Sequence, residues 1–189
     1  MKTLCSSCFF AAAAVAAASP VMAETVPADR TEEGRAIAAE FSSELRAALQ
    51  AAMAEGGPLA AIRVCNEDAP RIAAAAAERS GAVVGRTSLK VRNPANRPDE
   101  HERAVLEAFA DELAPGAEGP PPERLDVLAD GRVRYMSAIV IQPPCLACHG
   151  ESLAPPVAEA IGALYPADAA RGYQFGELRG AFTITWSAD

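Results

Sequence analysis

The fold is decided by the stretch RLDVLADGRVRYMSAIVIQPPCLACHG, which runs from Arg124 to Gly150. Its first part places Asp130-Gly131 between two alternating runs, at 124–129 and 132–141. An Asp-Gly pair between alternating runs is a strong short-range signal for a β-hairpin. The sequence therefore predicts two antiparallel strands that are joined by a tight turn.

The second predicted strand leads through two prolines into Cys145-Leu146-Ala147-Cys148-His149. Cys-x-x-Cys-His is the attachment signature for c-type haem, in which two thiols add to the vinyl groups and the adjacent histidine can bind the iron. We therefore predict that Cys145 and Cys148 hold one covalently attached haem c and that His149 is an axial iron ligand.

Two other readings of the cysteine pair remain open. A haem-free thiol-disulfide oxidoreductase would use Cys145 and Cys148 as a redox pair, which normally opens a helix after a strand in a βαβ unit. The prolines before the pair and Gly150 after it fit that context poorly. A zinc site is weaker, because only Cys65 and His101 could complete it.

Helices are predicted upstream of the hairpin. Apolar residues recur at spacings of three and four between positions 30 and 55, namely at Ile37, Phe41, Leu45, Ala48, Leu49 and Ala52. This pattern is typical of a long amphipathic helix, which Gly56-Gly57-Pro58 should end. A short helical piece through Ile62 leads to Cys65, and Asn66 or Asp68 can cap a further helix that closes at Ser80-Gly81. Cys65 is thus expected just ahead of a helix N-terminus.

The rest of the chain alternates between short strands and helices. We expect a strand from Val83 to Val91 with one cationic face, a loop over 93–98, and a helix that Asp99 caps and that runs to about Leu113. A Gly/Pro-rich loop covers 115–122, a short helix covers 155–164, and a final strand alternates from Leu178 to Trp186. Helices first and then mostly antiparallel strands indicate an α+β domain.

The N-terminus reads as a secretory signal. Lys2, a short alanine-rich apolar run and the small residues Val21 and Ala23 predict cleavage after Ala23, which leaves residues 24–189 as a single domain. Cys5 and Cys8 would leave with the signal. The remaining 16 basic and 25 acidic side chains give a net charge of −9, which disfavours nucleic acid or anionic lipid as partners. We expect a periplasmic or secreted protein without membrane insertion after cleavage.

Four residues could supply the second axial ligand: Cys65, His101, Met53 and Met136. His101 lies in a charged helix start and Met53 fits the packing surface of the first helix, so Met136 is the better rival. Cys65 is the thiol left over, and a helix dipole behind it would favour the thiolate. An inert buried thiol is an equally good reading on spacing alone. Thiolate and His149 together would give a low-potential haem.

A cationic segment could neutralise the haem propionates. Between Gly85 and Arg97 the chain carries Arg86, Lys90, Arg92 and Arg97 and no acid. Arg86, Lys90 and Arg92 are our candidates for cofactor binding. The same cluster could equally form a solvated strand face or a docking patch for an acidic redox partner.

With these residues identified, the sequence resembles a small family of exported c-type haem domains with a PAS-like fold, found alone or as sensory domains. Its matching segments include Cys65-Asn66, the run from Val84 to Asn96, the motif itself, Tyr165 to Tyr173 and Gly176 to Phe182. The resemblance implies a central antiparallel sheet with flanking helices. It also implies haem ligation by His149 and the upstream Cys65.

The function expected from these features is one-electron transfer at low potential, or haem-based redox or gas sensing, with an unidentified redox or signalling partner. A carrier keeps both axial bonds in the two oxidation states. In a sensor, Cys65 would leave the iron on reduction and a gas would bind. Haem peroxidase activity needs an open sixth position and a distal base, so we do not expect an enzyme.

Overall fold

The hairpin predicted from Asp130-Gly131 is present in the computed structural model, which describes residues 28–113 and 119–188. Its strands are β2 (Glu123–Val127) and β3 (Val133–Val140). The Leu128 N–H donates to the Arg132 carbonyl at 2.7 Å, and Gly131 takes a positive φ of 82° that suits glycine. With β1 (Val83–Thr87) and β4 (Leu178–Trp186), the hairpin forms an antiparallel four-stranded sheet of order β1-β4-β3-β2.

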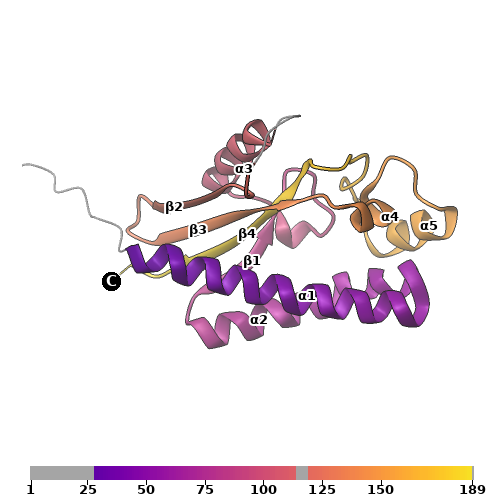
Figure 1. Cartoon of the computed structure of the whole chain (residues 1–189), viewed down its shortest axis with the longest axis horizontal. Helices are drawn as coiled ribbons and strands as arrows, with labels where there is room; N and C mark the ends of the chain where they lie inside the picture. Colours follow the sequence, from indigo (N-terminus) through magenta and orange to yellow (C-terminus); the bar gives the residue numbers. More distant parts are fainter. Residues whose placement is uncertain (1–27, 114–118, 189) are drawn as a thin grey trace, which may run out of the picture.

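Helices cover both faces of this sheet (Figure 1). The long α1 (Ala28–Arg63) runs along one face with α2 (Ala69–Ser80) beside it, and α3 (Glu100–Glu112) lies on the other face. The short helices α4 (Leu146–His149) and α5 (Pro155–Leu164) lie together at one end. The predicted α+β fold, with a central antiparallel sheet, flanking helices and a long N-terminal helix, is confirmed.

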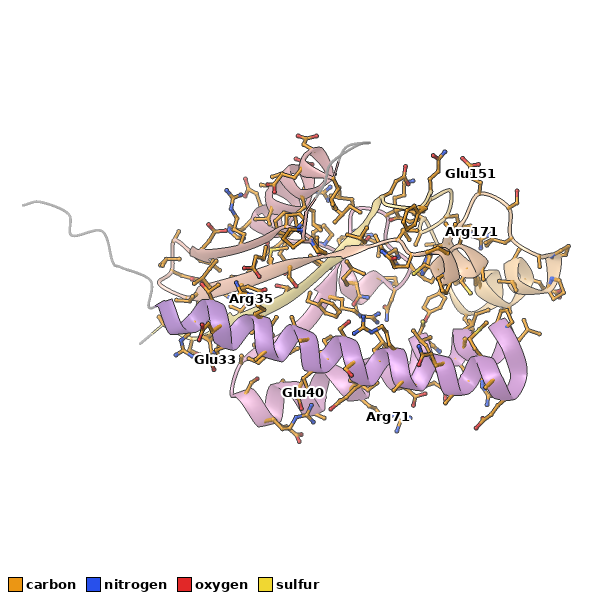
Figure 2. All side chains as sticks on the ribbon, viewed as in Figure 1. Glu33, Arg35, Glu40, Arg71, Glu151 and Arg171 are labelled. Atoms are coloured by element: carbon orange, nitrogen blue, oxygen red, sulfur yellow. The ribbon has the colours of Figure 1, made fainter. Side chains whose placement is uncertain are left out.

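The predicted apolar stripe attaches α1 to the sheet. Ile37, Phe41 and Leu45 are buried against Tyr135, Phe182 and Ile184, and each large side chain contributes about 1.5–3 kcal/mol through burial. The Phe41 and Phe182 rings meet edge to face at 5.3 Å. Glu33 and Glu40 lie on the flank of the helix next to α2, where Glu40 pairs with Arg79 at 3.1 Å (Figure 2). Burial of this stripe fixes the rotation of α1 about its axis.

Gly56-Gly57-Pro58 interrupts α1 as predicted. Gly56 and Gly57 have non-helical backbone angles, and Gly57 has a φ of 65°, so the helix consists of two pieces. Pro58 opens the second piece, where its missing N–H is not needed. The second piece carries Ile62 into contact with α5. The kink therefore lies at the end of the molecule that holds α4 and α5, and it turns the chain back toward α2 (Figure 1).

The predicted cap of α3 is also confirmed. The Asp99 carboxylate accepts the Glu102 N–H at 2.8 Å, and the Glu102 carboxylate accepts the Asp99 N–H at 3.1 Å, which is a capping box. Arg134 of β3 donates to Asp99 at 2.7 Å, and Thr183 of β4 donates to Glu102 at 2.9 Å. The cap thus also fastens α3 to the sheet.

The strand predicted over 83–91 is too long, because β1 ends at Thr87. The Ser88 hydroxyl lies 2.7 Å from the Arg179 carbonyl and 2.9 Å from the Lys90 carbonyl, which turns the chain back on itself. The expected single cationic face therefore does not form. Arg86 shares a face with the buried Val84, toward α1, whereas Lys90 and Arg92 lie beyond the strand.

The signal peptide predicted over 1–23 lies outside the described residues, as does part of the loop predicted over 115–122. Within 28–113 and 119–188, no helix combines the length and the apolar character needed to cross a membrane. The proposed limits of the single domain, 24–189, stay a prediction.

Gly34 tests the contact between α1 and the hairpin. A Cβ there would lie 2.8 Å from the Tyr135 Cβ and Cδ1, so Gly34→Ala should lower the free energy of unfolding by about 1–3 kcal/mol, although alanine favours helices. Urea denaturation measures the change. The matched control is Gly162→Ala in α5, where a Cβ meets nothing within 4 Å and stability should not fall. Equal effects of the two substitutions would contradict this packing of α1 on Tyr135.

Candidate cofactor site

The cysteine motif occupies a short turn after β3. Pro143–Cys145 forms a 3-10 turn, and α4 supplies the remaining four motif residues. The two prolines cannot donate to a strand ladder, which ends β3 at this point. A Cβ on Gly150 would lie 2.7 Å from the Leu146 carbonyl, so glycine suits the position directly after His149. The turn thus brings both cysteines and the histidine together within one compact segment.

The two motif thiols face different apolar clusters. Cys148 packs against the cluster of Ile62, Ile161 and Tyr165, whereas Cys145 packs against Ile141 and the cluster around it. Both thiols are free and partly exposed. Burial raises the pKa of the Cys148 thiol, although the nearby Arg92 acts in the opposite direction. Two unbridged thiols on one turn fit covalent attachment of a shared group.

The His149 imidazole is held in one orientation. Its Nδ1 lies 2.9 Å from the Ala170 carbonyl, and because a carbonyl only accepts, Nδ1 carries the proton. Nε2 therefore carries the lone pair, which meets the Arg179 Nε–H at 3.5 Å; a metal would take the place of this long contact. Burial, followed by the charges of Arg179 and Arg92, lowers the pKa of His149 to about 3. The imidazole is therefore neutral at physiological pH, as a metal ligand must be.

Arg92 lies behind the motif and is buried. Its guanidinium pairs with Asp168 at 3.0 Å and donates to the Cys148 carbonyl at 2.7 Å and to the Ala170 carbonyl at 3.1 Å. These contacts use its charge within the protein. The role predicted for Arg92, propionate binding, is not supported by this position, because Asp168 already neutralises it.

Cys65 lies at the junction of α1 and α2, in the π-helical turn Val64–Asp68. Arg63, Asp68 and Ala69 all have helical backbone angles, so the chain passes from α1 to α2 without a break. The expected helix N-terminus after Cys65 is therefore wrong, and with it the dipole argument for a thiolate. A π-turn adds a residue to the helical path and often marks a functional position.

The junction nevertheless directs Cys65 toward the motif. Burial lowers the pKa of Arg86 and of Arg179, and a thiolate at Cys65 would act against this lowering in both. A thiolate at Cys65 would likewise raise the pKa of Tyr165 and of Cys148. Segments that are far apart in the sequence thus bring Cys65, Arg86 and Arg179 to the side of the motif.

A cavity of about 420 Å³ extends from Cys65 along β1 to the loop that carries Asn93 and Arg97. Its volume falls within the usual range for ligand pockets. Arg86 lines it, and the guanidinium lies 5.8 Å from the centre of the Phe41 ring. Cys65 and Arg86 therefore share a cavity wall.

Arg179 is a site residue that the sequence pattern did not identify. Its Nε lies 3.5 Å from the His149 Nε2, and its Nη1 donates to the Ser88 hydroxyl at 2.8 Å. Lys90 lies 4.5 Å from the centre of the Tyr173 ring, and that ring meets the His149 ring edge to face at 6.2 Å. Arg179 thus borders the imidazole directly, whereas Lys90 borders the Tyr173 ring that packs against it. The only signal in the sequence was the position of Arg179 on the last predicted strand.

The rival ligands lie elsewhere. Met136 is buried beneath α3, on the sheet face opposite α1, with Leu106 and Phe109. His101 pairs with Asp126 at 3.2 Å. Met53, which was expected to pack within the first helix's buried surface, is 42% exposed. Met136 and His101 are thus engaged with other partners.

The donor set fits haem better than a bare metal ion. Among residues 28–113 and 119–188, no three His, Cys, Asp or Glu side chains converge as a zinc site requires. Haem iron takes four ligands from the porphyrin and needs at most two from the protein. One imidazole beside two free thiols meets that requirement, with Cys65 on the nearby cavity wall.

Comparisons with known proteins agree in family and fold. A protein-family model described as "Tll0287-like: Tll0287" matches residues 11–187. The crystal structure of the cyanobacterial heme-protein Tll0287 is similar at 30% sequence identity, with a TM-score of 0.52 over 63% of this chain and 69% of that chain. No curated protein matches the sequence.

The depressed pKa of His149 predicts an acid-sensitive fold. In the haem-free chain, lowering the pH from 6.5 to about 5 should reduce the free energy of unfolding by up to about 1.4 kcal/mol per pH unit, because only the unfolded imidazole takes up a proton. Asp99 and Asp168, whose pKa values are lowered, contribute below this window. Denaturation at several pH values should show that the free energy of unfolding depends less on pH in His149→Asn than in the unaltered chain.

The matched control for this measurement is His101→Asn, which removes a histidine on the far side of the sheet. The two variants together show which of the chain's two histidines carries the slope between pH 6.5 and about 5. A slope that survives in His149→Asn would show that another group carries it.

Proposed function

The chain belongs to the Tll0287-like family, and we propose that it is an exported mono-haem c-type protein that transfers single electrons at low potential. Cys145 and Cys148 would hold the haem through thioether bonds, with His149 as an axial ligand. When bound, haem supplies an iron that alternates between the ferric and ferrous states. A related protein of known structure is a heme-protein, which supports the proposal.

The observation that carries the proposal is the state of His149. Its Nδ1 proton is bound to the Ala170 carbonyl at 2.9 Å, and it directly follows two free thiols. Metal-ligating histidines almost always have one nitrogen fixed by a hydrogen bond in this way. The other nitrogen of His149 meets Arg179 Nε at 3.5 Å, a contact that iron would replace. A structural histidine would not need the two thiols beside it.

Cys65 is the second axial ligand in this proposal. It lies within electrostatic reach of Cys148 and lines the cavity beside β1. A thiolate there would neutralise the extra positive charge of the ferric site, so reduction would leave a net negative charge in a partly apolar pocket. This cost lowers the potential. Arg86 and Arg179 offset part of the cost because their charges lie nearby.

Arg86, Lys90 and Arg179 are the proposed partners of the haem propionates. Arg86 lines the cavity beside Cys65, and Lys90 and Arg179 both lie against the Tyr173 ring. Burial of Arg86 and Arg179 lowers their pKa values, so an incoming carboxylate would stabilise their charged forms. Arginine also offers a carboxylate two parallel hydrogen bonds.

Location and partner follow from the sequence. The signal-like segment over 1–23 would send the chain to the periplasm or beyond, where haem c is attached. The negative net charge of the chain disfavours nucleic acid as a partner. We propose that the partner is a separate redox protein.

Sensing is a second candidate, which the cavity beside Cys65 favours. That space would let the thiol leave the iron and admit a small ligand in its place. Thiol-disulfide exchange is less well supported, because burial raises the pKa of Cys148 whereas a reactive thiol needs a lowered one. Peroxidase activity is not proposed, because Cys65 would occupy the position that peroxide needs.

The first test is covalent attachment. In a host that attaches haem c, the exported chain should stay red after denaturation, and its mass should include one haem. Cys145→Ala with Cys148→Ala should remove the bound haem, whereas Cys65→Ser should keep it, because Cys65 lies outside the motif. Mass spectrometry decides the matter, and a colourless chain with a Cys145–Cys148 disulfide would support the oxidoreductase instead.

The second test concerns Cys65. Cys65→Ser should raise the midpoint potential by on the order of 100 mV, within the roughly 0.8 V range that axial ligands span. Met136→Leu, a volume-conserving change beneath α3, is the control and should leave the potential unaltered. Redox titration measures both. An unaltered midpoint potential in Cys65→Ser would show that Cys65 is not an axial ligand.

A spectrum of the reduced protein under carbon monoxide separates the two candidate roles. A carrier should show no change until Cys65 is replaced by serine, because the sixth position is filled. An immediate change in the unaltered protein would favour sensing.

A further inference from the structure

A buried ion pair lies directly behind the motif. The side chains of Asp168 and Arg92 are 1% and 8% exposed, and Arg92 Nε lies 3.0 Å from Asp168 Oδ1. Asp168 also accepts from Arg171 Nε at 2.7 Å and from the Ala170 N–H at 3.0 Å. Arg171 lies at the same end of the molecule as α4 and α5 (Figure 2). The pair is thus fixed on the loop that follows α5.

The same pair reaches the motif through two backbone carbonyls. Arg92 Nη2 donates to the Cys148 carbonyl at 2.7 Å and to the Ala170 carbonyl at 3.1 Å. The Ala170 oxygen is also the acceptor for His149 Nδ1, at 2.9 Å. One carbonyl oxygen therefore receives hydrogen bonds from a cation and from the imidazole.

We propose that Arg92 and Asp168 are positioning residues for His149, which hold the Ala170 carbonyl and through it set both the orientation of the imidazole and the electron density that it offers to iron. The inference rests on the proposed function, since it concerns His149 as a haem ligand. It adds a role for two residues that would touch neither iron nor porphyrin.

The direction of the effect follows from the shared oxygen. A carbonyl has two lone pairs, so it can accept both donors. A guanidinium that donates to it draws electron density away, which weakens its hold on the Nδ1 proton. A less polarised Nδ1–H leaves the imidazole a weaker donor, which disfavours ferric iron and raises the potential. Asp168 limits this effect by balancing the charge of Arg92.

Substitutions of Arg92 and of Asp168 are therefore expected to change the midpoint potential in opposite directions. In Arg92→Lys the single ammonium keeps the charge beside Asp168 but cannot span both carbonyls, so the Ala170 oxygen holds Nδ1–H more tightly and the potential falls. In Asp168→Asn the guanidinium loses its counter-charge, and the potential rises. A general loosening of the fold would not give opposite signs.

The experiment is a redox titration of the haem-loaded, full-length protein and its variants. Each variant should change the ferric/ferrous equilibrium severalfold, where tenfold corresponds to about 59 mV. Arg124→Lys on β2 is the control, because the Arg124 side chain is half exposed and lies 3.8 Å from the Asp126 carboxylate. Asp168→Glu keeps the charge pair, so its ferric/ferrous equilibrium constant should stay within about twofold of that of the unaltered protein.

Each result has one reading. Potentials that do not move in Arg92→Lys and Asp168→Asn, with stability reduced in both, would show a purely structural pair and overturn the proposal. An unaltered chain that carries no covalent haem would instead refute the proposed function. Where a variant does not fold, exchange of the His149 Nδ1 proton in the unaltered, haem-loaded protein decides: slow exchange supports the proposal, and exchange at the solvent rate overturns it.

Discussion

The buried ion pair between Arg92 and Asp168 is the interaction on which the candidate site depends. It joins the segment after β1, the cysteine motif and the loop after α5, which are far apart in the sequence. Isolated buried ions are costly, but this carboxylate accepts from two arginines and a backbone N–H, which satisfies it. Because the pair holds carbonyls rather than side chains, it constrains the backbone path around His149.

Charge is distributed unevenly over the molecule. The whole chain is acidic, with a net charge of −8, yet Arg179 lies beside the imidazole, Arg86 near the Cys65 thiol and Lys90 over the Tyr173 ring. Within residues 28–113 and 119–188, no carboxylate forms an ion pair with any of these three cations. A local excess of positive charge favours carboxylate groups at this end, whereas the acidic remainder of the surface disfavours polyanions.

Much of the fold could be predicted because local chemistry determined it. Asp130-Gly131 fixed the hairpin, Gly56-Gly57-Pro58 fixed the kink and Asp99 fixed the start of α3, since each acts over a few residues. The motif also predicted which thiols and which imidazole lie together. The length of β1 could not be predicted, because it depends on Ser88 meeting the Arg179 carbonyl 91 residues later. Arg179 and the π-turn at Cys65 were missed for the same reason: both arise from contacts between elements, which a local pattern does not record.

The number of residues in the π-turn at Val64–Asp68 determines how α2 is rotated about its axis relative to α1. Each residue added to a regular helix rotates everything beyond it by about 100°. The second piece of α1 is held by Ile62 against α5, and α2 is held by Ala76 in the main core. Loss of one residue from the turn would restore a regular helix and swing Cys65 away from the motif, so the length of this short segment is as constrained as its sequence. The nearby glycines at 56 and 57 lie outside that constraint and are the place where this helical arm can vary in length.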